Sequence, residues 1–207
     1  MYAQVTDDLR RAYDGSAAQR DAGEIAPWKQ AERAAFLARL RAAAARRLLE
    51  IGGGPGHHAA FYRDAGLDVV MTDLSPEMVR LARAKGLDAR TMDFLSLDFT
   101  AKFDAVFAFN CLLHVPKGDL PRVLAAVRRV LRPGGLFYYG VYGGESSEGV
   151  SPTDWHNPPR FFAFYDDDEL RAAVAGPFDL VDFHRVELPE GERGHFQSLT
   201  LRRAEGG

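Results

Sequence analysis

The sequence predicts an α/β fold in which a doubly wound, mostly parallel sheet of seven strands carries helices on both faces. From residue 48 onward, short apolar segments alternate with helical patterns, which is the order that parallel strands joined by crossover helices require. A glycine-rich loop at 52–56 directly follows the first of these segments. The two closing strands, near 178–186 and 195–202, are expected to form a terminal antiparallel pair.

The individual elements follow from the apolar patterns and their breakers. Strands are expected at 48–51, 68–72, 89–92, 103–109 and 136–141, and helices near 58–65, 76–84, 120–131 and 167–175. Gly66 and Gly86 stop the first two of these helices, and residues 132–135 form a tight turn into the fifth strand. Residues 143–160 are expected to be rich in loops.

The N-terminal 47 residues are rich in Ala, Arg and Asp. They show helical spacing at 8–13 and again at 29–47. Gly15, Gly23 and Pro27 are expected to divide these two helices.

Length and composition bound the class of protein. The chain has 207 residues and a mass of 22.9 kDa, which fits one domain with a sizeable core. It carries 26 Lys and Arg against 29 Asp and Glu, a net charge of −3, which argues against a nucleic-acid partner bound through its backbone. No run approaches the roughly 18 apolar residues of a membrane helix, and the N-terminus lacks the apolar core of a signal peptide. The single cysteine, Cys111, excludes an internal disulfide and fits a reducing compartment, so we expect a cytoplasmic protein without a membrane partner.

The glycine loop has the features of a nucleotide site. The glycines at 52, 53, 54 and 56 let a ligand approach the backbone closely and permit positive φ. Free N–H groups of the loop and the start of the next helix favour polar or anionic ligand groups. However, the dinucleotide-binding pattern G-x-G-x-x-G would place its third glycine at position 57, where this chain has His57. Glu50 would repel a pyrophosphate but attract an ammonium, so a ligand with adenine, ribose and an amino acid head fits better.

The segment 50–56, Glu-Ile-Gly-Gly-Gly-Pro-Gly, resembles motif I of the class I S-adenosylmethionine (SAM) dependent methyltransferases. Residues 110–114 are similar to the fourth motif of that family, and 131–136 to its Leu-x-Pro-Gly-Gly turn. The resemblance implies a Rossmann-like fold and SAM as the cofactor, with S-adenosylhomocysteine (SAH) as the product. It also implies one domain with a helical lid at 1–47, a SAM-binding core at 48–141, and a substrate loop with the closing strands at 142–207.

Residues that close the expected strands are the candidates for cofactor contacts. Asp73 stands 21 residues after Gly52, near the spacing of about 20 expected for an acid on the ribose hydroxyls. Asp73 is not needed as a cap for the helix expected at 76–84, because Ser75 can serve as the N-cap and Pro76 suits the first helical position. By resemblance to the family, Asp93 would hold the adenine amino group. The remaining candidates for adenine, methionine or lid contacts are Phe94, Leu74, Met78, Asn110, Tyr13 and Trp28.

The acceptor side of the site offers two general-base candidates, His114 and His156, and a less favoured one, Asp154. Methyl transfer from a sulfonium needs a base only if the acceptor must lose a proton. We expect no metal site, because neighbouring residues His57 and His58 diverge on a helix. Residues 166–169 are interpreted as an N-cap with its acidic first turn, and Cys111 is interpreted as a packed strand-end residue.

The sequence therefore predicts an enzyme, a SAM-dependent methyltransferase acting on a small molecule. Two alternatives stay open at this point: a nicotinamide-dependent oxidoreductase, and a catalytically silent SAM-binding protein that works through a partner.

Overall fold

The computed structural model describes residues 2–188 and 194–204 and confirms the expected seven-stranded sheet. The strand order is β3-β2-β1-β4-β5-β9-β8. The first five strands run parallel, and β9 runs antiparallel to both β5 and β8, as expected for the terminal pair. The strands are β1 Arg47–Ile51, β2 Asp68–Asp73, β3 Asp88–Thr91, β4 Phe103–Phe109, β5 Leu131–Gly143, β8 Asp179–Val186 and β9 His195–Arg202.

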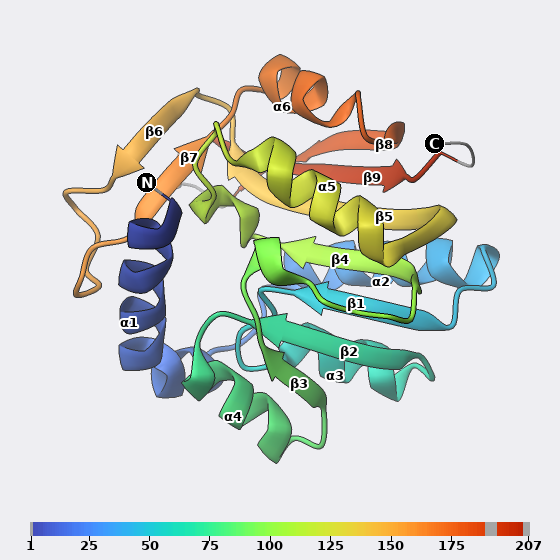
Figure 1. Ribbon diagram of the computed structural model, residues 1–207, viewed down its shortest axis with the longest axis horizontal. Coiled ribbons are helices and arrows are strands. Elements are labelled where there is room, and N and C mark those ends of the chain that lie inside the picture. The colour runs from blue at the N-terminus through green and yellow to red at the C-terminus, as the bar shows by residue number, and fades with distance from the viewer. Residues whose placement is uncertain (1, 189–193, 205–207) are drawn as a thin grey trace.

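Helices cover both faces of this sheet. In Figure 1, α5 lies in front of the central strands, and α2 and α3 lie behind them. Side chains of α2, α3 and α4 share one apolar core with the sheet, and those of α5 and α6 share the other. The bounds are α2 Pro27–Ala42, α3 His57–Asp64, α4 Pro76–Ala84, α5 Leu120–Val130 and α6 Asp167–Val174, with short 3-10 helices η1 Phe94–Ser96 and η2 Leu112–His114. No helix within residues 2–188 and 194–204 combines the length and the apolar character needed to cross a bilayer.

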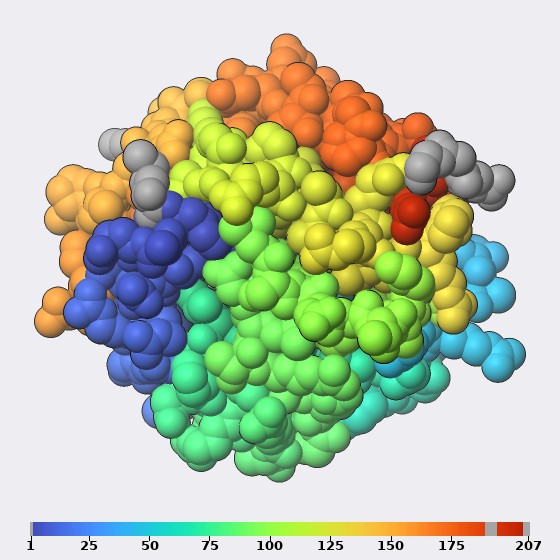
Figure 2. Space-filling model, viewed as in Figure 1, coloured from blue at the N-terminus to red at the C-terminus, as the bar shows by residue number. Residues whose placement is uncertain are grey.

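Helix α1, Tyr2–Asp21, lies across the carboxyl ends of the parallel strands (Figure 1). In Figure 2 its surface, in blue, adjoins the orange surface of the chain around residues 150–165. Two segments far apart in the sequence therefore meet at the edge of the sheet where an open α/β fold binds its ligands.

The N-terminal helices differ from the prediction in three places. The helix expected at 8–13 extends over all of α1, and Gly15 lies inside it. A glycine costs an exposed helix about 1 kcal/mol relative to alanine, but Ala12, Ser16 and Ala17 around it are buried, and this packing outweighs the local preference. Pro27 begins α2 instead of separating the helices, which is the favoured place for proline. The helix also ends at Ala42, because residues 43–46 turn the chain into β1.

The segment 143–160, expected to be loop-rich, contains a strand, and a second strand that was not predicted follows it at 161–164. Strand β6, Ser147–Val150, pairs antiparallel with β7, Phe161–Phe164, in a separate two-stranded sheet. Ser, Glu and Gly have low strand propensity, so the pattern of β6 gave no signal. Its conformation comes from pairing with the aromatic β7.

A buried carboxylate fastens α2 to the sheet. Glu32 accepts hydrogen bonds from the hydroxyls of Tyr138 at 2.9 Å and Ser198 at 2.6 Å. Nε2 of His184, on β8, lies 3.1 Å from its other oxygen, and Nδ1 lies 2.9 Å from Asp182. Burial lowers the pKa of His184, but the hydrogen bonds and charges of Glu32 and Asp182 outweigh it, so the net pKa is raised.

We predict that His184→Gln removes a pH-dependent part of the stability. The pKa of His184 is higher in the folded than in the unfolded protein. Its contribution to the free energy of unfolding is therefore complete below the unfolded pKa of about 6.5, and it is lost as the pH rises through the pKa of the folded protein. Urea unfolding should show the native protein losing more stability than the variant between about pH 6 and about pH 8. Equal losses in the two proteins would contradict this role of His184.

Candidate active site

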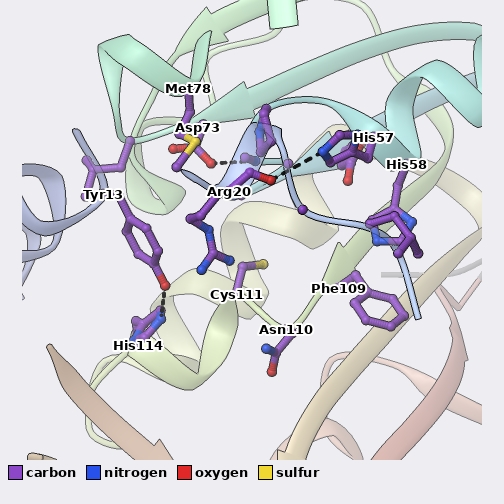
Figure 3. A pocket seen from close by; sticks show the side chains of 18 of the residues that line it. Tyr13, Arg20, His57, His58, Asp73, Met78, Phe109, Asn110, Cys111 and His114 are labelled. Atoms are coloured by element: carbon purple, nitrogen blue, oxygen red, sulfur yellow. Dashed lines mark hydrogen bonds between the residues drawn. The ribbon is translucent and has the colours of Figure 1, made fainter. Parts of the chain in front are cut away.

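A cavity of about 300 Å³ lies at the carboxyl ends of β1, β2 and β4, covered by α1. Its walls come from the glycine loop, the residues that end β2 and β4, the start of α3, and α1 with the segment after it (Figure 3). The strand order reverses beside β1, which is the place where open α/β sheets bind ligands. The glycine loop singled out in the sequence therefore lines a cavity.

The loop adopts the backbone conformation that only glycine accepts readily. Gly52, Gly54 and Gly56 have φ values of 63°, 57° and 87°. At Gly52 a Cβ would lie 2.5 Å from the Cβ of Cys111, so a side chain is excluded on steric grounds as well. At Gly54 a Cβ would meet nothing within 4 Å, and this residue lines the cavity. Gly54 therefore keeps the backbone open to a ligand.

Glu50 lies in β1 below the loop and is only 2% exposed. Gly53 lets it pack closely, since a Cβ there would lie 3.0 Å from the Glu50 Cδ. Burial raises the pKa of the Glu50 carboxyl well above its usual value. Its Oε2 has no hydrogen-bond partner in the described part of the chain, although Glu50 lines the cavity. An unpaired buried carboxyl oxygen is costly, so this atom suits a cationic or hydrogen-bonding ligand group.

Asp73 ends β2 and joins two loops of the site. Its Oδ2 accepts a hydrogen bond from the N–H of Gly54 at 2.8 Å, and its Oδ1 accepts one from the N–H of Ser75 at 2.9 Å. Burial raises the pKa of Asp73, and these two hydrogen bonds offset part of the effect. The hydroxyl of Ser75 accepts from the N–H of Met78 at 3.1 Å, so Ser75 caps α4 as predicted. Asp73 lines the cavity, and each carboxylate oxygen keeps further acceptor capacity for a ligand.

The residues expected around an adenine lie in two neighbouring places. Leu74, Met78 and Phe94 line the main cavity. Asp93 instead lines a small cavity of about 20 Å³ beside it. There it caps η1 and accepts a hydrogen bond from the hydroxyl of Tyr2 at 3.0 Å. Its contact with an adenine stays a prediction.

Asn110 and Cys111 follow β4 and face the glycine loop. Asn110 has φ at 54°, and its N–H donates to the carbonyl of Gly140 at 2.7 Å. Its Oδ1 has no partner among residues 2–188 and 194–204, and Asn110 lines the cavity. The Cys111 thiol donates to the carbonyl of Ile51 at 3.2 Å, and burial raises its pKa well above the ordinary value. Cys111 is therefore a protonated packing residue, as interpreted from the sequence.

Tyr13 links α1 to the strand ends (Figure 3). Its hydroxyl lies 2.5 Å from Nε2 of His114, whose Nδ1 lies 2.7 Å from the carbonyl oxygen of Phe161. A carbonyl only accepts, so Nδ1 carries the proton and Nε2 accepts from the tyrosine. Burial lowers the pKa of His114 to about 3, which keeps the ring neutral. Both nitrogens of this base candidate are therefore already occupied.

The other base candidates lie in the segment between β6 and β7. Asp154 accepts three hydrogen bonds from Arg160, at 2.8 to 2.9 Å, and lies 3.1 Å from Nδ1 of His156. Burial alone would raise the pKa of Asp154, but the hydrogen bonds from Arg160 hold it well below the usual value, which disfavours Asp154 as a base. Arg160 also donates to the hydroxyl of Tyr13 at 3.1 Å. The ring of His156 lies 5.9 Å from that of Tyr13, but His156 is not among the residues that line the cavity.

Several residues that line the cavity were not predicted to contact a cofactor, among them Arg20, Lys29, His58 and Phe109. The Arg20 side chain points into the cavity in Figure 3, with its guanidinium 5.1 Å from the ring of Tyr13. Burial lowers the pKa of His58 to about 3, and its Nδ1 has no partner in the described ranges. The sequence pattern around Arg20 is that of an arginine on a solvent-exposed helix face. Its place at the cavity therefore follows only from the tertiary fold.

Other sequence interpretations concern packing and metal binding. Trp28, the second lid candidate, packs on the rings of Phe109, Tyr142 and Phe196 and so fastens the start of α2. Asp166 caps α6 by accepting from the N–H of Glu169 at 2.8 Å, as predicted. Of the residues that the structure describes, no three His, Cys, Asp or Glu side chains are grouped to hold a metal ion.

Comparisons with known proteins agree with this geometry. Residues 48–135 match a family model described as a methyltransferase domain. A ubiquinone biosynthesis O-methyltransferase of Xanthomonas oryzae pv. oryzae is 35% identical over 109 residues, which are 49% of this chain and 44% of that protein. A demethylmenaquinone methyltransferase of Renibacterium salmoninarum is 31% identical over 64% of this chain and 55% of its own length. The chain thus spans about half the length of the curated relatives it matches.

Solved structures extend the similarity over the whole chain. A Burkholderia thailandensis 1,6-didemethyltoxoflavin-N1-methyltransferase, with bound 1,6-didemethyltoxoflavin and SAH, is 25% identical with a TM-score of 0.76. The alignment covers 99% of this chain and 91% of that one. A magnesium protoporphyrin IX methyltransferase from Synechocystis PCC 6803 is 14% identical with a TM-score of 0.71 over 96% of this chain and 99% of that one, and shares the fold.

Two glycines with nearly equal φ allow a matched test of the loop. Gly54→Ala should cost about 1–2 kcal/mol of stability, because only the left-handed backbone opposes the new side chain. Gly52→Ala should cost about 2–5 kcal/mol, because overpacking against Cys111 adds to the backbone strain. Urea unfolding of both variants measures the difference, and equal losses would contradict the packing described here.

Proposed function

We propose that the chain, whose residues 48–135 match a methyltransferase-domain family model, is a class I SAM-dependent methyltransferase that transfers a methyl group from SAM to a small-molecule acceptor. The observation that carries this proposal is the cavity at the strand ends, where the glycine loop, Glu50 and Asp73 converge. The methyltransferase relatives, and SAH bound to the Burkholderia structure, support the same cofactor.

The residues present fit this cofactor on structural grounds. The unpartnered Oε2 of Glu50 and Oδ1 of Asn110 lie in residues that line one cavity, and both atoms suit an ammonium donor. Gly54 presents an open backbone to the same space. Asp73 ends the neighbouring strand with acceptor capacity for ribose hydroxyls. When bound, the cofactor supplies a methyl group on a positively charged sulfur.

Two further sets of contacts complete the proposed cofactor site. Leu74, Met78 and Phe94 supply apolar walls for the adenine, with Asp93 as the predicted partner of its amino group. Arg20 supplies a cation for the amino acid carboxylate, since its side chain points into the cavity from α1 (Figure 3).

The chain's work in this reaction is to orient the reactants and to exclude water. Helix α1 covers the cavity, and Tyr13 ties it to His114 and to Arg160. These contacts support a role of residues 1–47 as a lid. His114 and His156 remain the predicted candidates for a general base.

The two alternatives left by the sequence are not favoured. An oxidoreductase fits poorly with His57 in the glycine pattern and with relatives that are methyltransferases. The relatives and solved structures named above are methyltransferases, which does not favour a catalytically silent SAM-binding protein. That the acceptor is not a nucleic acid, and that the protein works in the cytoplasm, stay predictions from its charge balance and cysteine content.

We predict that Asp73→Asn weakens SAM binding by about 1.5–3 kcal/mol, the loss expected for hydrogen bonds to a charged group. Asp104→Asn is a matched control. Asp104 also accepts two backbone N–H bonds, from Arg46 and Arg47 at 2.9 and 2.8 Å, but lies at the opposite ends of the strands. Calorimetry should show normal SAM affinity for the control, and unchanged affinity of a folded Asp73→Asn protein would remove Asp73 from the site.

We also predict that Tyr13→Phe opens the lid more readily. The variant keeps the ring but loses the hydrogen bonds to His114 and Arg160, so SAH should dissociate about 2- to 10-fold faster in stopped-flow measurements. Tyr62→Phe serves as the control, because the Tyr62 hydroxyl donates to the carbonyl of Arg33, between α3 and α2. A rate that changes equally in both variants would argue against a lid contact through Tyr13.

A further inference from the structure

One end of the main cavity is lined by residues that the proposed cofactor site does not use. They come from the segment between α1 and α2, the first turn of α2, the start of α3 and the end of β4, and include Glu24, Lys29, His58 and Phe109. In Figure 3, His58 and Phe109 lie on one side of Asn110. Asp73 and Tyr13 lie on its other side. The end of the cavity at His58 is therefore the part that an acceptor can occupy.

The ring of His58 is held firmly at this end, but its nitrogens are unused. It packs on the ring of Phe109 with centroids 4.9 Å apart and on that of Phe107 with centroids 5.6 Å apart. Nδ1 is buried without a hydrogen-bond partner in the described part of the chain, and Nε2 has no partner there either but is not buried. Since His58 is half-buried and lines the cavity, a ligand can reach the ring at Nε2.

His58 offers such a ligand a neutral donor. Burial lowers the pKa of His58 to about 3, and the positive charges of Arg33 and Lys29 lower it further, so the ring carries one proton at neutral pH. A proton on the buried Nδ1 would have no acceptor, whereas a proton on Nε2 can be donated into the cavity. The N–H at Nε2 therefore calls for an acceptor that enters from outside the chain.

Positive charge exceeds negative charge around this ring. Lys29 lines the cavity, with its ammonium 5.2 Å from the ring of Trp28. Arg33, one turn further along α2, has a buried Nε without a hydrogen-bond partner among residues 2–188 and 194–204. Burial raises the pKa of Glu50 well above its usual value, so this acid offsets little of the charge. Glu24 lines the same cavity but is exposed, so water screens it. An anion is the ligand group that this end favours.

The cofactor already has another cation for its carboxylate. Arg20, proposed above as that partner, lowers the pKa of Asp73 and of His114 by its charge, so it acts on the opposite side of the cavity. Lys29 acts in the same way on the pKa of His58. The two cations thus serve different ends of the cavity, and the end at Lys29 has no assigned ligand.

We infer that the acceptor carries a carboxylate, which the ammonium of Lys29 and the N–H of His58 bind at the end of the cavity beside Phe109. This inference rests on the proposed function. Two donors from two helices hold the carboxylate at two points, so they orient the acceptor as well as bind it. The ring of Phe109 gives the carbon skeleton an apolar wall. Lys29 and His58 are thereby residues that determine specificity.

The test uses the full chain saturated with SAH and two fluorinated probes of similar shape, 4-fluorobenzoate and 4-fluorobenzamide, observed by ¹⁹F NMR. Only the benzoate is negatively charged. We expect it to bind at least about tenfold more tightly than the amide, because hydrogen bonds to a charged group are the stronger ones.

Variants at the two donors separate the anion site from general packing. Lys29→Met should reduce the affinity for the benzoate by about tenfold and leave that for the amide unchanged. His58→Phe keeps a ring against Phe109 but loses the donor, and should weaken benzoate binding by about 3- to 10-fold. Lys102→Met is the matched control, because Lys102 is exposed and donates to the carbonyl of Arg129 at the opposite ends of the strands. Its affinity for both probes should be native.

A second arm distinguishes the carboxylate of the acceptor from that of the cofactor. Lys29→Met is titrated with SAH and with the SAH analogue that lacks the carboxylate, 5′-deoxy-5′-(3-aminopropylthio)adenosine. We expect native affinity for both, because Arg20 is the proposed partner of the cofactor carboxylate. A loss of SAH affinity that the analogue does not share would assign Lys29 to the cofactor and overturn the inference.

The remaining outcomes separate the two proposals. A native protein that fails to bind SAH overturns the proposed function itself. If SAH binds, then the absence of benzoate binding, or equal binding of benzoate and amide, overturns the inference. Native benzoate affinity in a folded Lys29→Met protein overturns it as well.

Discussion

The carboxylate of Asp73 fixes the geometry on which the candidate site depends. One oxygen holds the N–H of Gly54, and the other holds the N–H of Ser75. The loop after β1 and the start of α4 are therefore set against the same group at the end of β2. This constraint places the open backbone of Gly54 beside two buried carboxyl groups, those of Glu50 and Asp73, and so defines the shape of the cavity and the acceptors that it offers a ligand.

Helix α1 adds a wall that the sheet itself cannot supply. Tyr13 meets His114 after β4 and Arg160 before β7, so one hydroxyl joins three separate parts of the chain. Because each hydrogen bond contributes only about 1 kcal/mol, these contacts can hold α1 over the cavity and still break to let a ligand leave. The same junction, through Arg160 and Asp154, holds the ring of His156 against that of Tyr13.

The sequence predicted best what depends on local rules. The strand 103–109 and the helix 76–84 were predicted with their observed bounds, because apolar runs, a serine cap and a first-turn proline are local signals. The break predicted at Gly15 was wrong because the packing of α1 outweighs the low helix propensity of glycine. Strand β6 was not predicted because its conformation depends on pairing with β7. Arg20 and the bond between Tyr13 and His114, 101 residues apart, arise from tertiary contacts that no local pattern encodes.

The most direct test of the account is a calorimetric titration of the purified chain with SAM, SAH and NADH in parallel. The cavity described here predicts micromolar binding of SAM and SAH and no binding of NADH, because His57 stands where the dinucleotide pattern has its third glycine. Binding of NADH alone would contradict the assignment of the glycine loop, and the proposed methyl transfer would fall with it.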